Sequence, residues 1–164
     1  ADRRGVPRDW RDQQEQRALD DIAAHGCHVL HVLEEGDLPP FAYSVGIQQT
    51  SQAPEVIVVG LQRPVAHFVV NEYNSRVRAS ESFMPGTLYA GFLEGFDVQF
   101  APVERSHYRD YLGWARWLYR GDEFPALQLI YPSTSGAWPW DSEASEDFRA
   151  RQPLLGAPHS NGAG

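Results

Sequence analysis

Residues 55–61, EVIVVGL, form the sequence feature that most constrains the fold of this 164-residue chain. A strand that is apolar at nearly every position is buried on both of its faces, whereas a half-exposed strand alternates apolar with polar residues. We therefore interpret this run as a central strand of a sheet. Other strands must pair with it on its two sides, and helices must pack against the sheet.

The segment before this run has the period of a strand. Residues 41–47, FAYSVGI, alternate bulky with small side chains, so that bulky residues share one face and small residues the other. The small face predicts the close approach of another backbone or of a ligand. Residues 48–53 predict a polar loop. Further strands are predicted at residues 27–33, 87–93, 96–103 and 126–131.

Three segments have helical periodicity. The first spans about residues 9–25, with Asp9 as its cap and Gly26 after its last turn. The second begins at Pro64, and the third begins at Ser106 and ends before Gly121. The order of elements, αβββαββαβ, predicts an α+β fold with a single mixed, mostly antiparallel sheet of about six strands and three helices packed against it.

A chain of this length is most simply one domain, which we place at residues 1–141. From residue 142 the sequence is acidic and then rich in Gly, Pro and Ala, which predicts a mobile tail over residues 142–164. The single cysteine, Cys27, cannot form an internal disulfide, and no apolar run reaches the ~20 residues that cross a bilayer. We expect a cytoplasmic protein that has no membrane partner, and the sequence predicts no particular oligomeric state.

The chain carries 22 acidic residues and 14 basic ones, and every basic residue is an arginine. The absence of lysine excludes a Schiff-base lysine and the lysine of a phosphate-binding P-loop. Residues 18–140 hold fourteen acids against seven arginines. Such a region repels phosphate backbones, so we expect no nucleic-acid partner, and its charge suits a basic protein partner.

Several segments of the chain occur in a characteristic order: HGCHV at 25–29, PPFAYSVGI at 39–47, PEVIVVGL at 54–61, VAH at 65–67 with Asn71, LQLIYP at 127–132, Gly136, and WPW at 138–140. Together they resemble an uncharacterised bacterial family, the domain of unknown function 4262. The resemblance covers about residues 18–141 and implies no established activity. The chain departs from the pattern at Cys27, where an aromatic residue is expected, and at Ser133, where an aspartate is expected.

A few polar residues are candidates for a catalytic or small-molecule site. His67 and Asn71 lie four residues apart on the second predicted helix and share a face, so the amide could orient the imidazole as a general base. A structural hydrogen-bonded pair is the alternative interpretation. Tyr43 and Ser44 lie in the segment with the small-residue face, where a pocket would bring them together with His28 and the helical pair.

His28, His31, His67 and His107 are the candidate metal ligands. In a strand over residues 27–33, the first two of these differ by an odd number, so they point to opposite faces and cannot bind one ion together. A metal site would need one of them to meet His67 or His107 across the fold. A flavin would need a phosphate-binding group, and residues 48–53 contain no arginine. We therefore predict no cofactor, with a divalent metal or a flavin as the alternatives.

Four tryptophans stand out as a surplus of large aromatic side chains: Trp114, Trp117, Trp138 and Trp140. They indicate a binding surface or, alternatively, a hydrophobic lid over the edge of the sheet. Gln128 interrupts an apolar strand and, if it points inward, needs a hydrogen-bond partner such as a ligand or a backbone group.

These features favour a domain that acts by binding a protein partner rather than by catalysis. A regulatory domain, or an immunity-type partner of a basic protein, fits the acidic charge and the tryptophans. The alternative is a small-molecule, cofactor-dependent or metal-dependent enzyme that uses a pocket near Tyr43 and Ser44 with His28, His67 and Asn71.

Overall fold

The computed structural model describes residues 6–157, and of residues 6–9 only the backbone. Its strands are β1 (His28–Val32), β2 (Phe41–Val45), β3 (Glu55–Val59), β4 (Tyr89–Leu93), β5 (Phe96–Pro102) and β6 (Ala126–Ile130). Its helices are α1 (Val6–His25), α2 (Ile47–Ser51), α3 (Arg63–Arg78), α4 (Tyr108–Tyr111), α5 (Gly113–Tyr119) and α6 (Glu146–Arg151), with a 3-10 turn, η2 (Arg105–His107), before α4.

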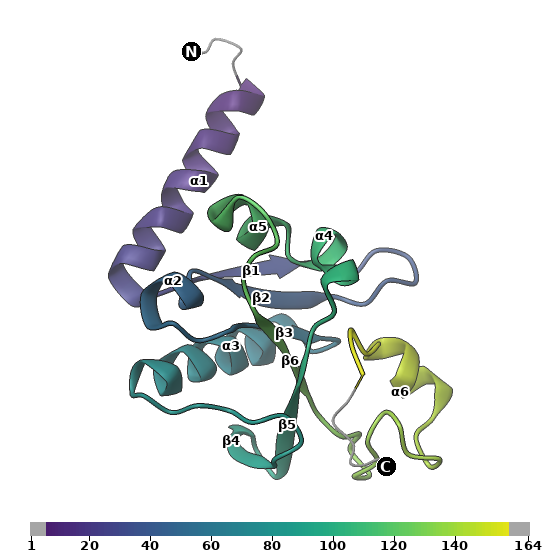
Figure 1. Ribbon diagram of the computed structural model, residues 1–164. Coiled ribbons are helices and arrows are strands. Elements are labelled where there is room, and N and C mark those ends of the chain that lie inside the picture. The colour runs from purple at the N-terminus through teal and green to yellow at the C-terminus, as the bar shows by residue number, and fades with distance from the viewer. Residues whose placement is uncertain (1–5, 158–164) are drawn as a thin grey trace.

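The six strands form one mixed sheet in the order β1-β2-β3-β6-β5-β4 (Figure 1). Among the described strands, only β3 and β6 run parallel, and every other neighbouring pair is antiparallel. All five residues of β3 are buried, as expected of a central strand that is covered on both faces. The prediction of an α+β fold with one mixed, mostly antiparallel sheet is confirmed.

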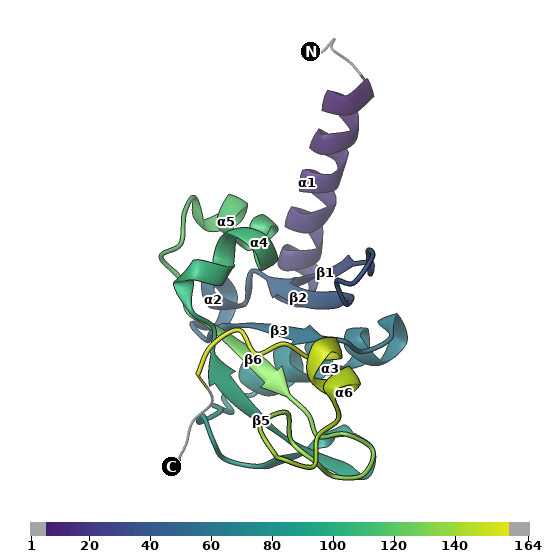
Figure 2. The ribbon, with the colours of Figure 1, turned by 90° about the vertical axis from the view of Figure 1, so that its right-hand side faces the viewer.

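Helices cover both faces of this sheet. Helix α3 packs on one face, while α4, α5 and the end of α1 pack on the other (Figures 1 and 2). The alternation of side chains along β3 divides the core accordingly, because Val56 and Val58 belong to the α3 side and Ile57 and Val59 to the opposite side. No helix among residues 6–157 is long and apolar enough to cross a membrane.

Helix α1 packs on the sheet through its last turns, where Ala18 and Ile22 are buried, and its first half projects away from the sheet (Figure 2). A Cβ atom placed on Gly46, just after β2, would lie 2.7 Å from a side-chain carbon of Ile22. The small residues after Phe41 therefore leave room for other parts of the same chain and not for a ligand. Ala42, for example, packs in the core on the α3 side.

The helices differ in number from the prediction, which expected three. The segment predicted as a polar loop at residues 48–53 contains most of α2, because the carboxylate of Glu55 accepts the amide hydrogens at its start. The third predicted helix is interrupted at Leu112, whose φ and ψ of −122° and 40° are not helical. The amide of Trp114, just beyond this break, donates to the hydroxyl of Tyr43 on β2 at 2.9 Å.

The packed part of the chain runs past residue 141, where the sequence predicted the domain to end. Phe148 of α6 contacts Tyr131 on the α3 side, while Leu155 is 1 % exposed and lies in the core of the opposite side. Two glutamines hold this segment: the amide of Gln152 exchanges hydrogen bonds with the backbone of Tyr131, and that of Gln128 does so with the backbone at residues 153 and 155. Residues 158–164 of the predicted tail lie outside the described residues.

Candidate functional site

Two hollows flank the seam between the edge strand β1 and helix α3. The first, which we call the arginine hollow, has a volume of about 410 Å³ and lies where β1 ends, α3 begins and α6 comes close. Arg63 at the start of α3, Arg151 at the end of α6, and His31 line it, together with apolar side chains that include Phe41 and Leu61. The Nε atom of Arg151 donates to the carbonyl of the residue after β3, Gly60, at 2.7 Å, which fixes its position.

The second hollow, the histidine hollow, lies on the other side of the same seam, near the end of α1. Its volume is about 370 Å³. His67 and Asn71 of α3 line it, as do Asp21, His25 and Cys27. The prediction that the two α3 residues share a face is confirmed, because both open into the same hollow.

Two stacked histidines separate the hollows. Nε2 of His31 lies 2.9 Å from Nδ1 of His67, and their ring centroids are 5.1 Å apart. Partial burial lowers the pKa of His31 to about 4, with further lowering from the positive charge of Arg63 and from His67 and His28. His31 is therefore neutral at pH 7, and one imidazole of the pair donates to the other.

The remaining candidate metal ligands do not join this pair. His28 lies on the opposite face of β1, as the period of a strand predicts, and its Nδ1 is 2.7 Å from a carboxylate oxygen of Asp21. His107 lies in η2 and packs against Tyr111 on the far face of the sheet. Within residues 6–157, no three His, Cys, Asp or Glu side chains are placed to hold a metal ion.

The pocket expected near Tyr43 and Ser44 is not formed by those residues. Both are buried, at 2 % and 0 % exposure, and neither lines the hollows at the β1–α3 seam. Tyr43 accepts a hydrogen bond from the amide of Trp114 in the first turn of α5, and Ser44 donates to Glu55 at 2.6 Å. Since these polar atoms are satisfied within the core, they stabilise the fold and offer nothing to a ligand.

Glu55 is the buried group whose role the sequence did not reveal. Its carboxylate is fully buried and accepts hydrogen bonds from the hydroxyls of Ser44 and Tyr119 and from three amides, of Gly46, Ile47 and Gln48, at 3.0 to 3.2 Å. Burial raises the pKa of Glu55, and these hydrogen bonds oppose that shift. The signal in the sequence was an acid at the head of an apolar run, which favours a buried, satisfied carboxylate over a solvated one.

Cys27 is unsuited to nucleophilic chemistry. Burial raises the pKa of its thiol to about 12, with a smaller contribution from the charge of Glu55. A nucleophilic cysteine needs an accessible thiolate, which this environment disfavours. Cys27 therefore forms part of the core on the α3 side.

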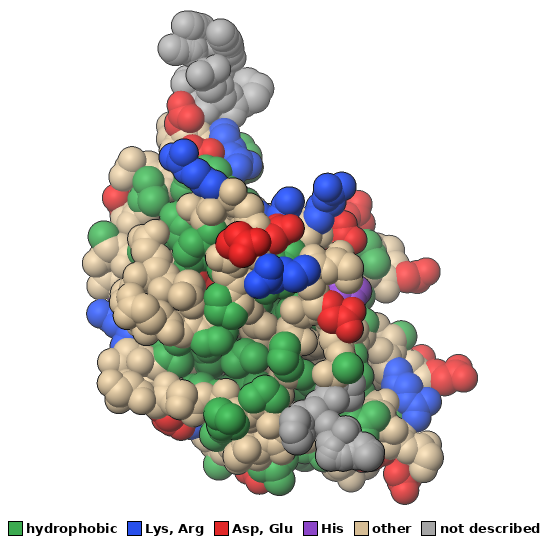
Figure 3. Space-filling view, in the orientation of Figure 1, with side chains coloured by type: hydrophobic (Ala, Val, Ile, Leu, Met, Phe, Trp, Pro, Cys, Tyr) green, Lys and Arg blue, Asp and Glu red, His purple; other side chains and the backbone are tan. Residues whose placement is uncertain are grey.

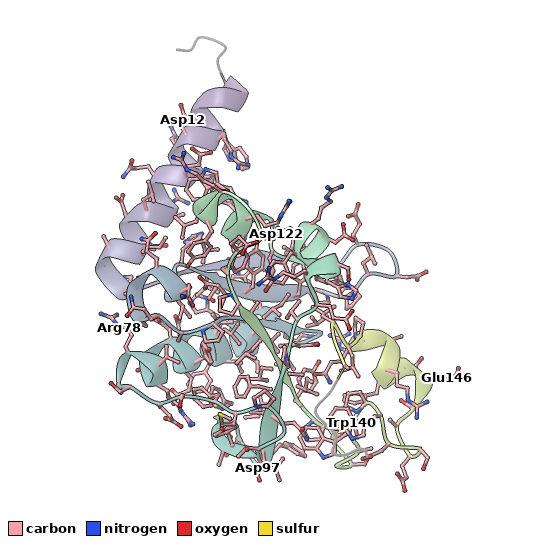
Figure 4. The ribbon with its side chains drawn as sticks, in the orientation of Figure 1. Asp12, Arg78, Asp97, Asp122, Trp140 and Glu146 are labelled. Carbon is pink, nitrogen blue, oxygen red and sulfur yellow. The ribbon has the colours of Figure 1, made fainter. Side chains whose placement is uncertain are left out.

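The four tryptophans form two separate pairs. Trp114 and Trp117 pack edge to face on α5, with the guanidinium of Arg11 from α1 4.3 Å from the ring centre of Trp114. Trp138 and Trp140 stack in parallel at 5.5 Å, and Trp140 lies near α6 and far from α5 (Figure 4). The pairs do not make one surface. Gln128, also proposed as a binding residue, is hydrogen-bonded by the chain's own C-terminal segment.

Residues 33–38, between β1 and β2, form an exposed turn, and we call it the hairpin tip. The exposed fractions of Leu33 and Leu38 are 74 % and 64 %. Glu35 and Leu38 exchange two backbone hydrogen bonds, at 2.9 and 3.0 Å, so the tip is itself a tight turn. With Glu34, Glu35 and Asp37 it places two apolar side chains among three carboxylates. Acidic side chains are visible in Figure 3 where this loop projects in Figure 1.

A family model described as "Domain of unknown function (DUF4262)" matches residues 21–145. The chain belongs to this family. The match covers the whole sheet, α3 and the hairpin tip, and agrees with the resemblance of residues 18–141. No curated protein and no solved structure matches the chain.

The DUF4262 match leaves out most of α1 and the whole of α6. The histidine hollow and the hairpin tip therefore lie within the family region. The arginine hollow takes one of its two guanidinium groups, that of Arg151, from outside it.

Proposed function

We propose that this domain binds a basic protein partner through the hairpin tip and the adjoining edge of β1. The observation that carries the proposal is the pair of exposed leucines, Leu33 and Leu38, held on a tight turn among three carboxylates. Exposed apolar side chains that cluster together and are surrounded by polar residues are typical of protein-binding surfaces. The carboxylates would select a partner that carries lysine or arginine.

The backbone of the tip favours such a role because it is already ordered. Glu35 and Leu38 close the turn through two hydrogen bonds, and Gly36 takes a φ of 59°, which is unfavourable for most side chains. A partner would therefore not have to order this loop, and the entropic cost of binding is reduced.

The edge strand beside the tip supports the proposal. β1 pairs only with β2 among the described strands, which leaves one row of backbone groups for an added strand. An extended segment of the partner, paired along that edge, would place its own apolar side chains next to the hairpin tip and next to Val32, which is 37 % exposed. The net charge of −8 attracts a basic partner at long range and disfavours nucleic acid.

A regulatory or immunity-type role fits a domain that acts through such a surface. A cytoplasmic location fits its single cysteine, which is buried and unpaired. The tip suits this role better than the tryptophans do, because the two tryptophan pairs lie apart and three of their four rings are half-buried.

A synthetic peptide of alternating lysine and leucine residues tests the tip as a binding surface. Its affinity, measured by fluorescence anisotropy, is expected to fall as salt rises, because exposed charges are screened. Combining Glu34→Gln, Glu35→Gln and Asp37→Asn is expected to weaken binding about tenfold, at a few tenths of a kcal/mol for each charge pair. Leu33→Ser with Leu38→Ser is expected to weaken it as much or more.

The matched control neutralises three acids away from the tip, with Glu94→Gln, Asp97→Asn and Glu123→Gln, so that the net charge changes equally. Its affinity is expected to stay within about twofold of the wild type, since long-range charge alone contributes little at physiological salt. Equal losses in the two triple variants would show that only net charge matters and would reject the tip as the site.

The histidine hollow supports a second candidate function, binding or conversion of a small molecule. His67 and Asn71 converge there, and His31 orients the imidazole of His67. This keeps part of the enzyme hypothesis. The other residues of that hypothesis do not contribute to the hollow, because Tyr43 is buried in the core and His28 is paired with Asp21 on the opposite face of β1.

Elemental analysis and an absorption spectrum of the purified protein separate the two candidates. We expect no stoichiometric transition metal and no flavin absorbance, because the histidine pair lacks a third ligand among the described residues. A metal bound at one per chain, and lost in His67→Gln but not in the matched His107→Gln, would instead favour the second function.

A further inference from the structure

The arginine hollow concentrates positive charge in a chain that is acidic as a whole. Arg63 and Arg151 come from α3 and α6, which are far apart in the sequence, and both line a cavity of about 410 Å³. Within residues 6–157, neither guanidinium forms an ion pair with a carboxylate. Two guanidinium groups without counter-ions in one concave site are suited to an anion, since arginine matches carboxylate and phosphate geometry.

Two further observations indicate a positive potential in this hollow. The charge of Arg63 is among the causes that lower the pKa of His31, which lines the same cavity. The first turn of α3 contains no acidic residue and Gln62 makes no side-chain cap, so its free amides add partial positive charge beside Arg63. The arginine side chains remain the main feature, and the helix start adds to them.

Most of the remaining lining is apolar. Phe41 and Leu61 face the same cavity as the two arginines. The one carboxylate of the lining belongs to Glu34, which also borders a smaller hollow with the hairpin tip and Arg151. A ligand that fills the cavity would therefore place a charged group on the arginines and an apolar group against the ring of Phe41.

We propose that the arginine hollow is a binding site for a small organic anion, in which Arg63 and Arg151 hold a carboxylate or phosphate and Phe41 and Leu61 contact an apolar body. This site adjoins the protein-binding surface and shares Leu33 and Glu34 with the hairpin tip, but the arginines that would hold the anion lie outside the tip. Each proposal can hold or fail without the other.

Three probes test the site at constant ionic strength: phenyl phosphate, benzoate and inorganic phosphate. Binding is followed by two-dimensional NMR and by the titration of His31. We expect phenyl phosphate or benzoate to shift the amides of Leu61 and Arg63 and to raise the midpoint of His31, because a bound anion favours the protonated imidazole. The probe that binds more tightly shows whether the site prefers a phosphate or a carboxylate. Inorganic phosphate is expected to bind more weakly than phenyl phosphate.

Arg63→Gln is expected to weaken binding roughly tenfold or more, as the loss of a charge-assisted hydrogen bond predicts. Arg63 is exposed, so the variant should fold normally. Arg109→Gln, an exposed arginine of α4 on the other face of the sheet, is the matched control and is expected to bind like the wild type.

The proposal fails if none of the three probes shifts residues around the hollow, or if Arg63→Gln and Arg109→Gln weaken binding equally, which would indicate general electrostatic screening. Equal affinity for inorganic phosphate and phenyl phosphate would overturn the apolar contact with Phe41 and Leu61.

Discussion

Replacing Glu55 with alanine is expected to lower the free energy of unfolding by about 4 kcal/mol, since removal of the shared acceptor from a buried hydrogen-bond network leaves its donors unsatisfied. Three backbone amides and the hydroxyls of Ser44 and Tyr119 would lose their acceptor in a site with no exposure. The carboxylate joins β2, β3, α2 and α5, so both the sheet and one helical layer depend on it. Urea unfolding followed by circular dichroism measures the loss.

Two further variants provide reference values for the loss of stability expected from Glu55→Ala. Tyr119→Phe removes one donor to Glu55 and the acceptor of the Gln49 amide, and we expect a loss of about 1–2 kcal/mol. Glu94→Ala changes an exposed acid in the turn between β4 and β5, and its effect should stay within about 0.5 kcal/mol. If Glu55→Ala unfolds at the same urea concentration as Glu94→Ala, the network does not stabilise the fold in the way proposed.

A chain that ends at Ser145 is expected to lose about 5 kcal/mol or more of stability, which is comparable with the whole stability of many small domains. The truncation removes Leu155 from the core and leaves both the amide of Gln128 and the backbone of Tyr131 without their partners. Thermal and urea unfolding, followed by tryptophan fluorescence, would report the change against the full chain.

Point substitutions keep this prediction testable if the truncated chain does not fold. Leu155→Ala is expected to cost about 3 kcal/mol, as is usual for a leucine deleted from a core. Leu154→Ala, at the half-exposed neighbouring position, should cost less than about 1 kcal/mol. Equal and small effects at the two positions would mean that the C-terminal segment contributes nothing to the domain.

The strands were predictable because their signals are local. The apolar run at residues 55–61 and the alternation at 41–47 both lie on observed strands, β3 and β2. Helix α2 was missed because its start is satisfied by Glu55, which follows it in the sequence and lies on another element. The third predicted helix was interrupted for a similar reason, since Tyr43 of β2 takes up an amide at the start of α5.

The candidate site was predictable only in part. Four-residue spacing placed His67 and Asn71 on one face, and both line the histidine hollow. The odd spacing of His28 and His31 predicted that they lie on opposite faces of the strand, but no local pattern indicated that His31 would stack on His67. The arginine hollow depends on Arg63 and Arg151, which are brought together by the way α6 packs against the end of β3.

The sequence by itself determined the class of this protein: periodicity and apolar runs specify the strands and the longer helices, and the order of those segments specifies family membership. Tertiary structure decided which polar groups are hydrogen-bonded within the fold and which remain accessible. Tyr43, Ser44, Gln128 and Glu55 are satisfied by distant parts of the chain, whereas Leu33 and Leu38 of the hairpin tip are exposed and Arg63 and Arg151 line a cavity. Hydrogen-bond partners and charge clusters join residues that are far apart in sequence, so no local pattern encodes them.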